Sequence, residues 1–322
     1  MSPATRARVM AAARELGYRP NALARAMISG RSGMIAVVVA YLDNHFYPVV
    51  LEQLSRALQA RGLHTLLFMT EPGDQDSVVQ EMLQYQVEGV VLASATLSSR
   101  LARTCAQAGI PVVMFNRSVR DSAASSVTSD NRDGGAQLAD FLVAAGHRRI
   151  AFIAGAEDSS TSRDREAGFV AGLARHRLTL AARAVGAYTF AGGAQAARDL
   201  LDRPRGARSA GRRASPRPSG RLDAIFVAND HMAIAAMDVI RGELGLRIPQ
   251  DLSIVGYDDV PEANWVGYRL TTVRQPAQEM ITQTVAILCE QIQNRSVNTR
   301  AIVLPVDLVV RESARLPPAE AP

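Results

Sequence analysis

Polar residues that can bind a ligand follow several short apolar runs of the sequence, at the positions where strands are expected to end. They are Asn44, Asn116, Arg117, Asn229, Asp230, Asp258 and Asp259, with Arg163 and Arg165 near the start of an expected helix. Carboxylates accept hydrogen bonds from hydroxyl groups, and a guanidinium group donates several hydrogen bonds in a fixed plane. A set of Asn, Asp and Arg side chains therefore favours a binding site for a sugar or a similar polyol.

The sequence lacks the residue patterns on which many enzyme classes depend. It has 36 Arg and no Lys, which excludes P-loop nucleotide hydrolases and Schiff-base enzymes. It contains no GxGxxG, GxSxG or HExxH motif. The two cysteines, Cys105 and Cys289, have neither a paired spacing nor neighbouring histidines, which favours buried free thiols over a disulfide or a metal site. We therefore expect no catalytic centre, no metal and no cofactor.

Each of the polar positions also has a purely structural interpretation. Asn229 and Asp230 are suited to capping the helix that is expected to follow them. Asp258 and Asp259 are typical of a turn, and Arg165 is compatible with a solvated helix face. Aromatic residues near strand ends are often core residues rather than ligand contacts, and here they are Phe46, Tyr47 and Phe190. The residues alone leave both interpretations open.

Short β-branched runs alternate with amphipathic segments of helical length. Strands are expected at 34–42, 64–70, 89–94, 111–116 and 125–130, and again at 148–155, 184–190, 223–230 and 252–259. A helix at 277–294 and a strand at 301–313 follow. The alternation predicts two similar lobes with parallel sheets, and the extra helix and strand imply that the chain crosses back between them. Because ligands bind at the carboxyl ends of parallel strands, we expect a cleft between the lobes.

The net charge of +5 is concentrated in two segments. Residues 203–221 contain seven Arg and no acidic residue, and residues 1–33 contain six Arg against Glu15 alone. The first of these segments is rich in Pro, Gly and Ser, which predicts a surface loop. The longest apolar run, 34–42, is too short to cross a bilayer. We therefore expect a cytoplasmic globular protein without a membrane partner.

Several motifs, taken together, resemble the LacI/GalR family of bacterial transcriptional regulators in their order and spacing. They are GYRPNALARAM, AGHRRIAFIAG, TSRDREAGFVAGL, DAIFVANDHMAIAAM, RIPQDLSIVGYDD, LTTVRQP and LPVDLVVRES. The resemblance covers nearly the whole chain. It implies an α/β fold of the type I periplasmic-binding-protein kind, in which three crossovers join two Rossmann-like subdomains with parallel sheets. A partial helical headpiece and a hinge precede them.

The resemblance also implies domain boundaries and site residues. The headpiece remnant and hinge fall at 1–32, the N-terminal subdomain at 33–129 and 275–303, and the C-terminal subdomain, with the Arg-rich loop 203–221, at 130–274 and 304–322. Together with the strand-end residues, it places the effector contacts at Phe46, Asn116, Arg117, Arg165, Phe190, Asn229 and Asp258. The implied protein is a homodimeric, effector-responsive regulator of carbohydrate or related metabolism, expected to be a repressor, with a sugar-like effector. The alternative is a sugar-binding protein of the periplasmic type without a DNA role, which calls for a signal peptide.

The N-terminal residues predict a helix and a hinge. Ser2 is suited to an N-cap, Pro3 to the first helical position and Gly17 to the stop. Residues 22–28 make only two helical turns, which are marginal in isolation. The resemblance implies that this hinge helix forms on operator DNA and enters the minor groove, with contacts from Arg19, Asn21, Arg25 and Met27.

The helix-turn-helix that reads sequence in this family is expected upstream of the given chain. The family usually has VSPxTR where this chain has MSPATR. Because GTG encodes valine internally and methionine at a start, we hypothesise that the native protein begins further upstream. An in-frame stop codon directly before Met1 would contradict this. Without those helices, we expect weak and salt-sensitive DNA binding.

Overall fold

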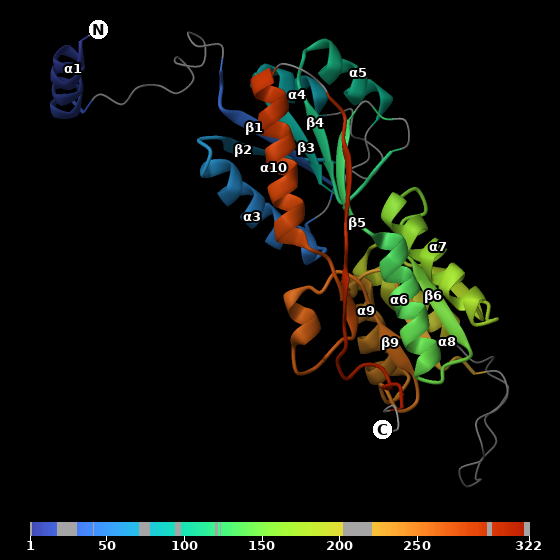
Figure 1. Ribbon diagram of the computed structural model, residues 1–322. Helices are drawn as coiled ribbons and strands as arrows, with labels where there is room; N and C mark the ends of the chain where they lie inside the picture. Colours follow the sequence, from blue (N-terminus) through green and yellow to red (C-terminus); the bar gives the residue numbers. More distant parts are fainter. Residues whose placement is uncertain are drawn as a thin grey trace, which may run out of the picture.

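Two lobes with parallel sheets make up the body of the molecule (Figure 1). The computed structural model describes residues 2–17, 31–40, 42–70, 78–93, 98–119, 122, 124–201, 221–294 and 298–318. Lobe 1 has the strand order β11-β5-β4-β3-β1-β2, and lobe 2 has the order β7-β6-β8-β9. Neighbouring strands in both sheets run parallel. The α/β fold class expected from the sequence is therefore confirmed.

The strands are short and mostly buried. In lobe 1 they are β1 (Met34–Val39), β2 (His64–Met69), β3 (Gly89–Ala93), β4 (Val112–Phe115), β5 (Ser125–Ser129) and β11 (Ala301–Leu304). In lobe 2 they are β6 (Ile150–Ala154), β7 (Ala182–Val185), β8 (Ala224–Val227) and β9 (Ser253–Val255). Runs such as β3, β4, β6 and β8 are buried along their whole length, as expected for sheets that helices cover on both faces.

Helices cover both faces of the lobe 1 sheet. They are α3 (Phe46–Gln59), α4 (Val79–Gln84), α5 (Ser99–Gln107) and α10 (Ala277–Asn294). Side chains alternate between the two faces along a strand. On β1, Ile35 and Val37 pack in the apolar cluster under α3 and α10, whereas Ala36 and Val38 pack in a second cluster under α4 and α5.

Lobe 2 has the same layers. Its helices are α6 (Asn131–Ala144), α7 (Ser160–Arg175), α8 (Phe190–Leu201) and α9 (Asp230–Asp238), followed by a π-helical turn at Val239–Glu243 and a 3-10 turn at Pro261–Asn264. Phe152 of β6 stacks on Phe169 of α7, with the ring centroids 6.3 Å apart. The adjacent Ile153 lies with Met232 of α9 against Gly186. Consecutive residues of β6 therefore serve opposite faces of the sheet.

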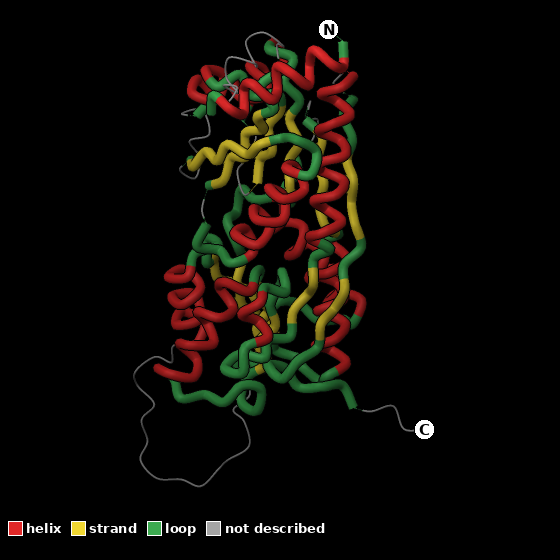
Figure 2. The backbone as a smooth tube through the Cα atoms, turned by 90° about the vertical axis from the view of Figure 1, so that its left-hand side faces the viewer, coloured by secondary structure: helices red, strands yellow, loops and turns green. Residues whose placement is uncertain are grey.

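The chain passes between the lobes at three places. It leaves β5 of lobe 1 and enters α6 of lobe 2, and it returns from β10 (Thr272–Arg274) to α10. It then leaves β11 and continues into β12 (Asp307–Val309), which pairs antiparallel with β10. Figures 1 and 2 show these segments side by side between the lobes.

Two strand predictions differ from the structure. The strand expected at 184–190 is β7 at Ala182–Val185, and α8 already begins at Phe190. Between them Ala187 and Tyr188 have positive φ angles of 53° and 63°, which turn the chain and end the strand. The single strand expected at 301–313 is divided into β11 and β12, because its two halves belong to different sheets.

The expected N-terminal helix is present as α1 (Pro3–Glu15). The Thr5 backbone N–H donates to Ser2 Oγ over 3.2 Å, and Gly17 follows the helix with a φ of +62°. The predicted hinge contacts Arg19, Asn21, Arg25 and Met27 lie outside the described residues. So does the Arg-rich stretch 203–221, except for its last residue.

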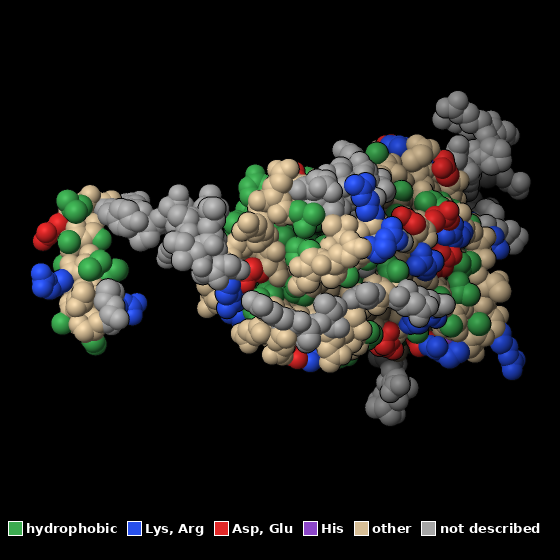
Figure 3. Space-filling model, turned by 90° about the horizontal axis from the view of Figure 1, so that it is seen from above, with side chains coloured by type: hydrophobic (Ala, Val, Ile, Leu, Met, Phe, Trp, Pro, Cys, Tyr) green, Lys and Arg blue, Asp and Glu red, His purple; other side chains and the backbone are tan. Residues whose placement is uncertain are grey.

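Charged side chains on the body are interspersed in sign. From above, Arg side chains lie among Asp and Glu side chains (Figure 3), and exposed ion pairs such as Arg198–Glu243 at 2.6 Å are common on lobe 2. Within the described part of the chain, no helix is long and apolar enough to cross a membrane.

Glycines allow α6 and α7 to cross at very short distance. A Cβ atom at Gly168 of α7 would collide with the backbone of Arg132 in α6, and a Cβ atom at Gly135 of α6 would collide with the carbonyl oxygen of Arg165 in α7. Only glycine leaves room for this contact. The crossing brings the side chains of Asn131 and Arg165 together, because they lie on the helix faces that meet.

A buried carboxylate fixes the start of α9. Asp230 is fully buried, and it accepts hydrogen bonds from the Val260 backbone N–H over 3.0 Å and from Thr272 Oγ1 over 2.6 Å. Burial raises the pKa of Asp230 to about 7, with the nearby Asp258 carboxylate acting in the same direction. The Asp230 carboxyl therefore joins α9 to the crossover strand β10 and to the loop after β9.

We predict that Gly168→Ala destabilises the protein, because the added methyl group must separate α6 from α7. The expected loss in the free energy of unfolding is about 1–3 kcal/mol, the usual cost of overpacking. Urea denaturation measures it. The matched control is Gly242→Ala, since a Cβ atom at Gly242 meets nothing within 4 Å. Equal stability of the two variants would show that the helices have room at this crossing.

We predict that Asp230 makes the protein less stable as the pH rises from about 4 to 7. The pKa of Asp230 is about 7 in the folded state and about 3.9 when unfolded, so only the folded state holds the proton in this window. Asp230→Asn removes the charge, and its amide oxygen can accept from the Val260 N–H while its NH2 group donates to Thr272 Oγ1. It should raise the free energy of unfolding by about 4 kcal/mol at pH 8 and change it little at pH 4.

Asp223 serves as the control for this pH dependence, because its pKa is shifted in the opposite direction. Burial opposes ionisation of Asp223, yet hydrogen bonds from His147 and from the backbone N–H groups of Arg148 and Arg149 give it a lowered pKa. Asp223→Asn should therefore lose stability at neutral pH rather than gain it. Urea denaturation at several pH values tests both variants, and a pH-independent difference for Asp230→Asn would contradict the assignment.

Candidate functional site

The carboxyl ends of the strands in both lobes converge on one small group of side chains. These side chains belong to Asn44, Phe46, Tyr47, Asn116, Thr161, Arg165, Tyr188, Asn229 and Asp258. We call this group the central site. Asn44 to Tyr47 follow β1, Asn116 follows β4, and the remaining residues come from lobe 2. The space between them is about 10 Å³, which is room for about one water molecule.

Arg165 is the most constrained residue of the central site. It is 1% exposed, and its Nη2 lies 3.1 Å from Asp258 Oδ1. Its Nε donates to Asn131 Oδ1 over 2.8 Å, and its Nη1 donates to the Ala228 carbonyl oxygen over 2.6 Å. The centre of the guanidinium group lies 3.7 Å from the centroid of the Tyr257 ring. A buried cation is stable only with such a set of partners, so the solvated-face interpretation of Arg165 is wrong.

Asp258 connects Arg165 to the crossovers. Gln275 Nε2 donates to Asp258 Oδ1 over 2.7 Å, and Ser129 Oγ donates to Gln275 Oε1 over 2.7 Å. Burial raises the pKa of Asp258 to about 6, although Arg165 and Gln275 lower it. The carboxyl is therefore mostly ionised at neutral pH and forms a true ion pair with Arg165. Its backbone φ of 125° is unusual for a residue with a side chain.

Two amide groups of the central site have one hydrogen-bonding atom left without a partner. Asn229 Oδ1 accepts from the Met232 backbone N–H over 3.0 Å, so the helix-capping interpretation of Asn229 is correct. Its Nδ2 is buried without a partner, and so is Asn116 Oδ1. Both side chains are less than 5% exposed. A ligand with hydroxyl groups offers an acceptor to the first atom and a donor to the second.

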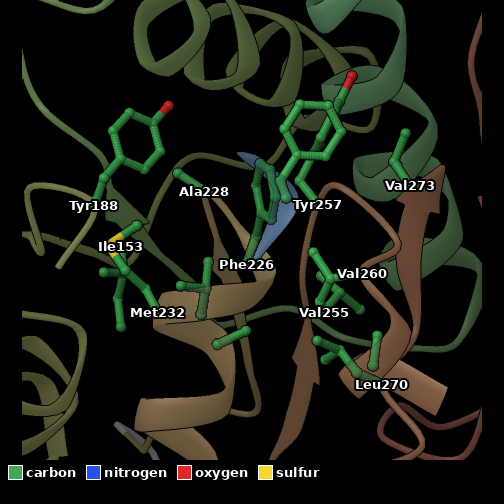
Figure 4. Close-up of a cluster of buried hydrophobic side chains, with 14 of the residues drawn as sticks. Ile153, Tyr188, Phe226, Ala228, Met232, Val255, Tyr257, Val260, Leu270 and Val273 are labelled. Atoms are coloured by element: carbon green, nitrogen blue, oxygen red, sulfur yellow. The ribbon is translucent and has the colours of Figure 1, made fainter. Parts of the chain in front are cut away.

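Aromatic rings complete the walls. Phe46 stacks against Phe115 of β4 with the ring centroids 6.5 Å apart. The Tyr188 hydroxyl lies 3.0 Å from Thr161 Oγ1. In Figure 4 the Tyr188 and Tyr257 rings stand above the ends of the lobe 2 strands. Burial raises the pKa of Tyr47, so its hydroxyl stays protonated at neutral pH.

The structure gathers five of the seven predicted effector contacts in the central site. Phe46, Asn116, Arg165, Asn229 and Asp258 all line it. The other two lie elsewhere. Arg117 is buried and lines a neighbouring cavity of about 680 Å³. Phe190 lies outside the central lining, because the chain has already turned at Tyr188 and entered α8; it is 42% exposed.

Four lining residues were absent from the predicted effector contacts: Asn44, Tyr47, Thr161 and Tyr188. Of these, Asn44 had been named among the polar candidates at strand ends and Tyr47 among the aromatic residues there. Asn44 and Tyr47 flank the predicted Phe46 at the end of β1, and their polarity at a strand end was the available signal. Tyr188 was missed because the strand was expected to continue to residue 190. Thr161 lies in the first turn of α7, one helical turn before Arg165, and this spacing places both side chains on one helix face.

The described side chains of the central site are hydrogen-bonding and aromatic groups. Among the described residues, no group of three or more His, Cys, Asp or Glu side chains is placed to hold a metal ion. Its charged groups are one paired carboxylate and one paired guanidinium. What the geometry offers is a set of donors and acceptors in a buried environment between aromatic walls, which is the composition of a small-molecule binding site.

Comparisons with known proteins agree with this fold. Residues 139–314 match a family model described as a periplasmic binding protein-like domain. The chain is 33% identical over 323 residues to the HTH-type transcriptional regulator CelR of Thermobifida fusca, covering 97% of this chain and 90% of that protein.

Two solved structures are similar over nearly the whole chain. One is a transcriptional regulator CelR–cellobiose complex, with a TM-score of 0.76, 31% identity and coverage of 98% of this chain and 92% of that one. The other is the lac repressor dimer bound to operator and the anti-inducer ONPF, with a TM-score of 0.82, 27% identity and coverage of 97% and 91%. The chain belongs to the LacI/GalR family of transcriptional regulators.

Proposed function

We propose that this regulator is a dimeric repressor whose operator binding is controlled by a sugar or sugar derivative held in the central site. The observation that carries the proposal is the buried Arg165–Asp258 pair facing two amide atoms without partners, Asn116 Oδ1 and Asn229 Nδ2. The similar CelR forms a complex with cellobiose, which supports a carbohydrate as the ligand.

The polarity of the central site suits hydroxyl groups. A hydroxyl that donates to the free lone pairs of Asp258 and accepts from Asn229 Nδ2 would satisfy both groups at once. Buried polar atoms without partners cost about 1–3 kcal/mol each, so a polyol that supplies these partners would bind with a corresponding gain. The Phe46 ring offers an apolar surface for the C–H face of a sugar ring.

Ligand binding requires the lobes to move. A space of about 10 Å³ is far smaller than a sugar ring, so the lobes must separate to admit the ligand and then close around it. The ligand shifts the equilibrium between two arrangements of the lobes only if it binds them with different affinity. In a dimer, that shift changes how the two copies of lobe 1 present their hinge segments to DNA.

The edge of the lobe 1 sheet provides a surface for dimerisation. β2 is an edge strand, and its side chains Leu67 and Met69 are 44% and 49% exposed. Tyr85, which packs edge-on against Phe68, is also exposed on this side. Exposed apolar groups beside an open sheet edge are characteristic of an association surface. We place the homodimer contact of lobe 1 there.

We expect Asp258→Ala and Arg165→Ala each to abolish the rise in melting temperature that an effector produces. Each removes one partner of a buried ion pair, which also lowers the stability of the free protein. The readout is therefore the ligand-induced shift, measured by differential scanning fluorimetry with sugars, sugar acids, sugar phosphates and purines. At a hundred times Kd the wild-type gain is about 2.7 kcal/mol.

Two further variants separate a loss of ligand binding from a loss of stability. Arg247→Ala removes an exposed ion pair on lobe 2 and should leave the ligand-induced shift intact. Asn116→Gly removes an amide oxygen that has no partner while keeping the positive φ of 61° accessible; it should weaken binding without unfolding the protein. An unchanged shift in both Asp258→Ala and Arg165→Ala would place the ligand elsewhere.

The proposed dimer can be tested by sedimentation equilibrium. Sedimentation equilibrium of the wild type should give twice the chain mass of 34.6 kDa. The double variant Leu67→Asp, Met69→Asp should sediment as a monomer, because charges at the sheet edge oppose association. Val170→Asp, at a similarly exposed apolar position in α7, is the control and should remain dimeric. A dimeric double variant would move the interface away from β2.

A further inference from the structure

A second group of side chains bridges the lobes beside the central site. It consists of Asp43 and His45 from lobe 1 and of Phe190, His231 and Glu262 from lobe 2, and we call it the histidine cluster. The His45 and His231 rings meet edge to face with centroids 5.2 Å apart, and the Phe190 ring meets His231 in the same way at 5.6 Å. The cluster therefore crosses the boundary between the lobes.

His231 of the histidine cluster is buried, and several polar atoms of the cluster have no hydrogen-bond partner. His231 is 4% exposed, and both of its ring nitrogens are buried without a hydrogen-bond partner. His45 Nδ1 and Glu262 Oε2 are also buried without one, although they lie 3.4 Å apart. The closest carboxylate oxygen to His231 Nε2, Asp43 Oδ2, is 3.9 Å away, which is beyond hydrogen-bonding distance. Buried polar atoms without partners are rare and call for an explanation.

The residues of the histidine cluster are close in sequence to residues that line the central site. His45 lies between Asn44 and Phe46, which line the central site. His231 follows the central Asn229 by two residues, on the first turn of α9. Phe190 follows the central Tyr188 by two residues, at the start of α8. A ligand that fills the central site and extends along the lobe boundary in this direction reaches the cluster next.

The chemistry of the cluster selects among ligand groups. Burial lowers the pKa of His231, so the ring is neutral at pH 7 and has one donor and one acceptor nitrogen. A hydroxyl group can serve either nitrogen. An anionic group would face the carboxylates of Asp43 and Glu262 and is disfavoured. The Phe190 ring, 42% exposed, adds an apolar surface of the kind that stacks on the C–H face of a sugar.

We propose that the histidine cluster is a second subsite, which holds the next unit of a neutral carbohydrate of two or more units whose first unit binds at Arg165 and Asp258. The proposal rests on the proposed function of the central site. It gives the preferred effector a class, a neutral disaccharide or longer oligosaccharide, and it gives His45, His231 and Phe190 the role of selecting that class over monosaccharides.

Isothermal titration calorimetry with matched sugars tests the subsite. The probes are glucose with cellobiose and maltose, galactose with lactose and melibiose, and xylose with xylobiose. We expect one disaccharide to bind at least about tenfold more tightly than its monosaccharide. Phe190→Ala and His231→Phe should each bring the Kd of that disaccharide close to the Kd of the monosaccharide and leave the latter unchanged.

The variants are chosen to keep the fold intact. Phe190 is half exposed, and His231→Phe retains an aromatic ring while it removes the two unsatisfied nitrogens, so the free protein should melt no lower than the wild type. Val170→Ala, at an equally exposed apolar position of lobe 2, is the control and should change neither Kd.

Different failures have different meanings. A monosaccharide that binds as tightly as its disaccharides overturns the subsite, and so do variants that weaken both sugars equally, since the cluster would then be a contact between the lobes only. If monosaccharides bind and Asp258→Ala abolishes this binding, the proposed function stands even when the subsite fails. If no sugar binds the wild type, the proposed function fails and the subsite fails with it.

Discussion

The requirement to stabilise one buried guanidinium group explains much of the structure around the lobe boundary. The Arg165 side chain is almost fully buried, and its neighbours accept or screen positive charge: a carboxylate, an amide oxygen, a carbonyl oxygen and an aromatic face. These partners come from α6, from the end of β8 and from the end of β9. Losing Asp258 would leave the charge uncompensated in a medium of low dielectric constant.

The placement of these partners around Arg165 also depends on the backbone conformation. The glycines of α6 and α7 permit the helix contact that brings Asn131 to Arg165. The loop after β9 takes a positive φ at Asp258 and at Asp259, and the Asp258 backbone N–H is held by the Val273 carbonyl oxygen over 2.8 Å. Residues in such conformations persist only where their surroundings hold them. Sheet ends, helix crossing and crossover strands thus form one connected polar unit.

The sequence predicted this arrangement only in part. Alternating strands and helices, and the extra elements after the second lobe, were sufficient for the fold class, because period and length are local properties. Asn229 and Asp258 were identified because polar residues at strand ends are conspicuous, and Arg165 because it lies near the start of an expected helix in a motif that resembles the family. Phe190 was placed at a strand end because the two residues with positive φ angles, Ala187 and Tyr188, are not glycine, and the adjacent Gly186 alone did not mark the turn.

Hydrogen bonds between residues that are far apart in the chain could not be predicted from the sequence alone. The bond from Ser129 to Gln275 joins positions 146 residues apart, and nothing in either local segment indicates it. The unsatisfied nitrogens of His231 likewise depend on which side chains the second lobe meets in the first. Whether a buried polar atom finds a hydrogen-bond partner depends on the folded core. A sequence shows which atoms can form hydrogen bonds, but it does not show which of them remain without a partner.

The antiparallel pairing of β10 with β12 has a mechanical consequence. Three separate connections would let the lobes bend, slide and twist with comparable ease. Here two of the three connections are hydrogen-bonded to each other at Thr272–Val309, Val273–Leu308 and Arg274–Asp307, and the third is tied to one of them through the Ser129–Gln275 bond. A bonded ribbon flexes across its thin direction and resists shear within its plane. The pairing therefore favours bending of the lobes about one axis over sliding of one lobe past the other.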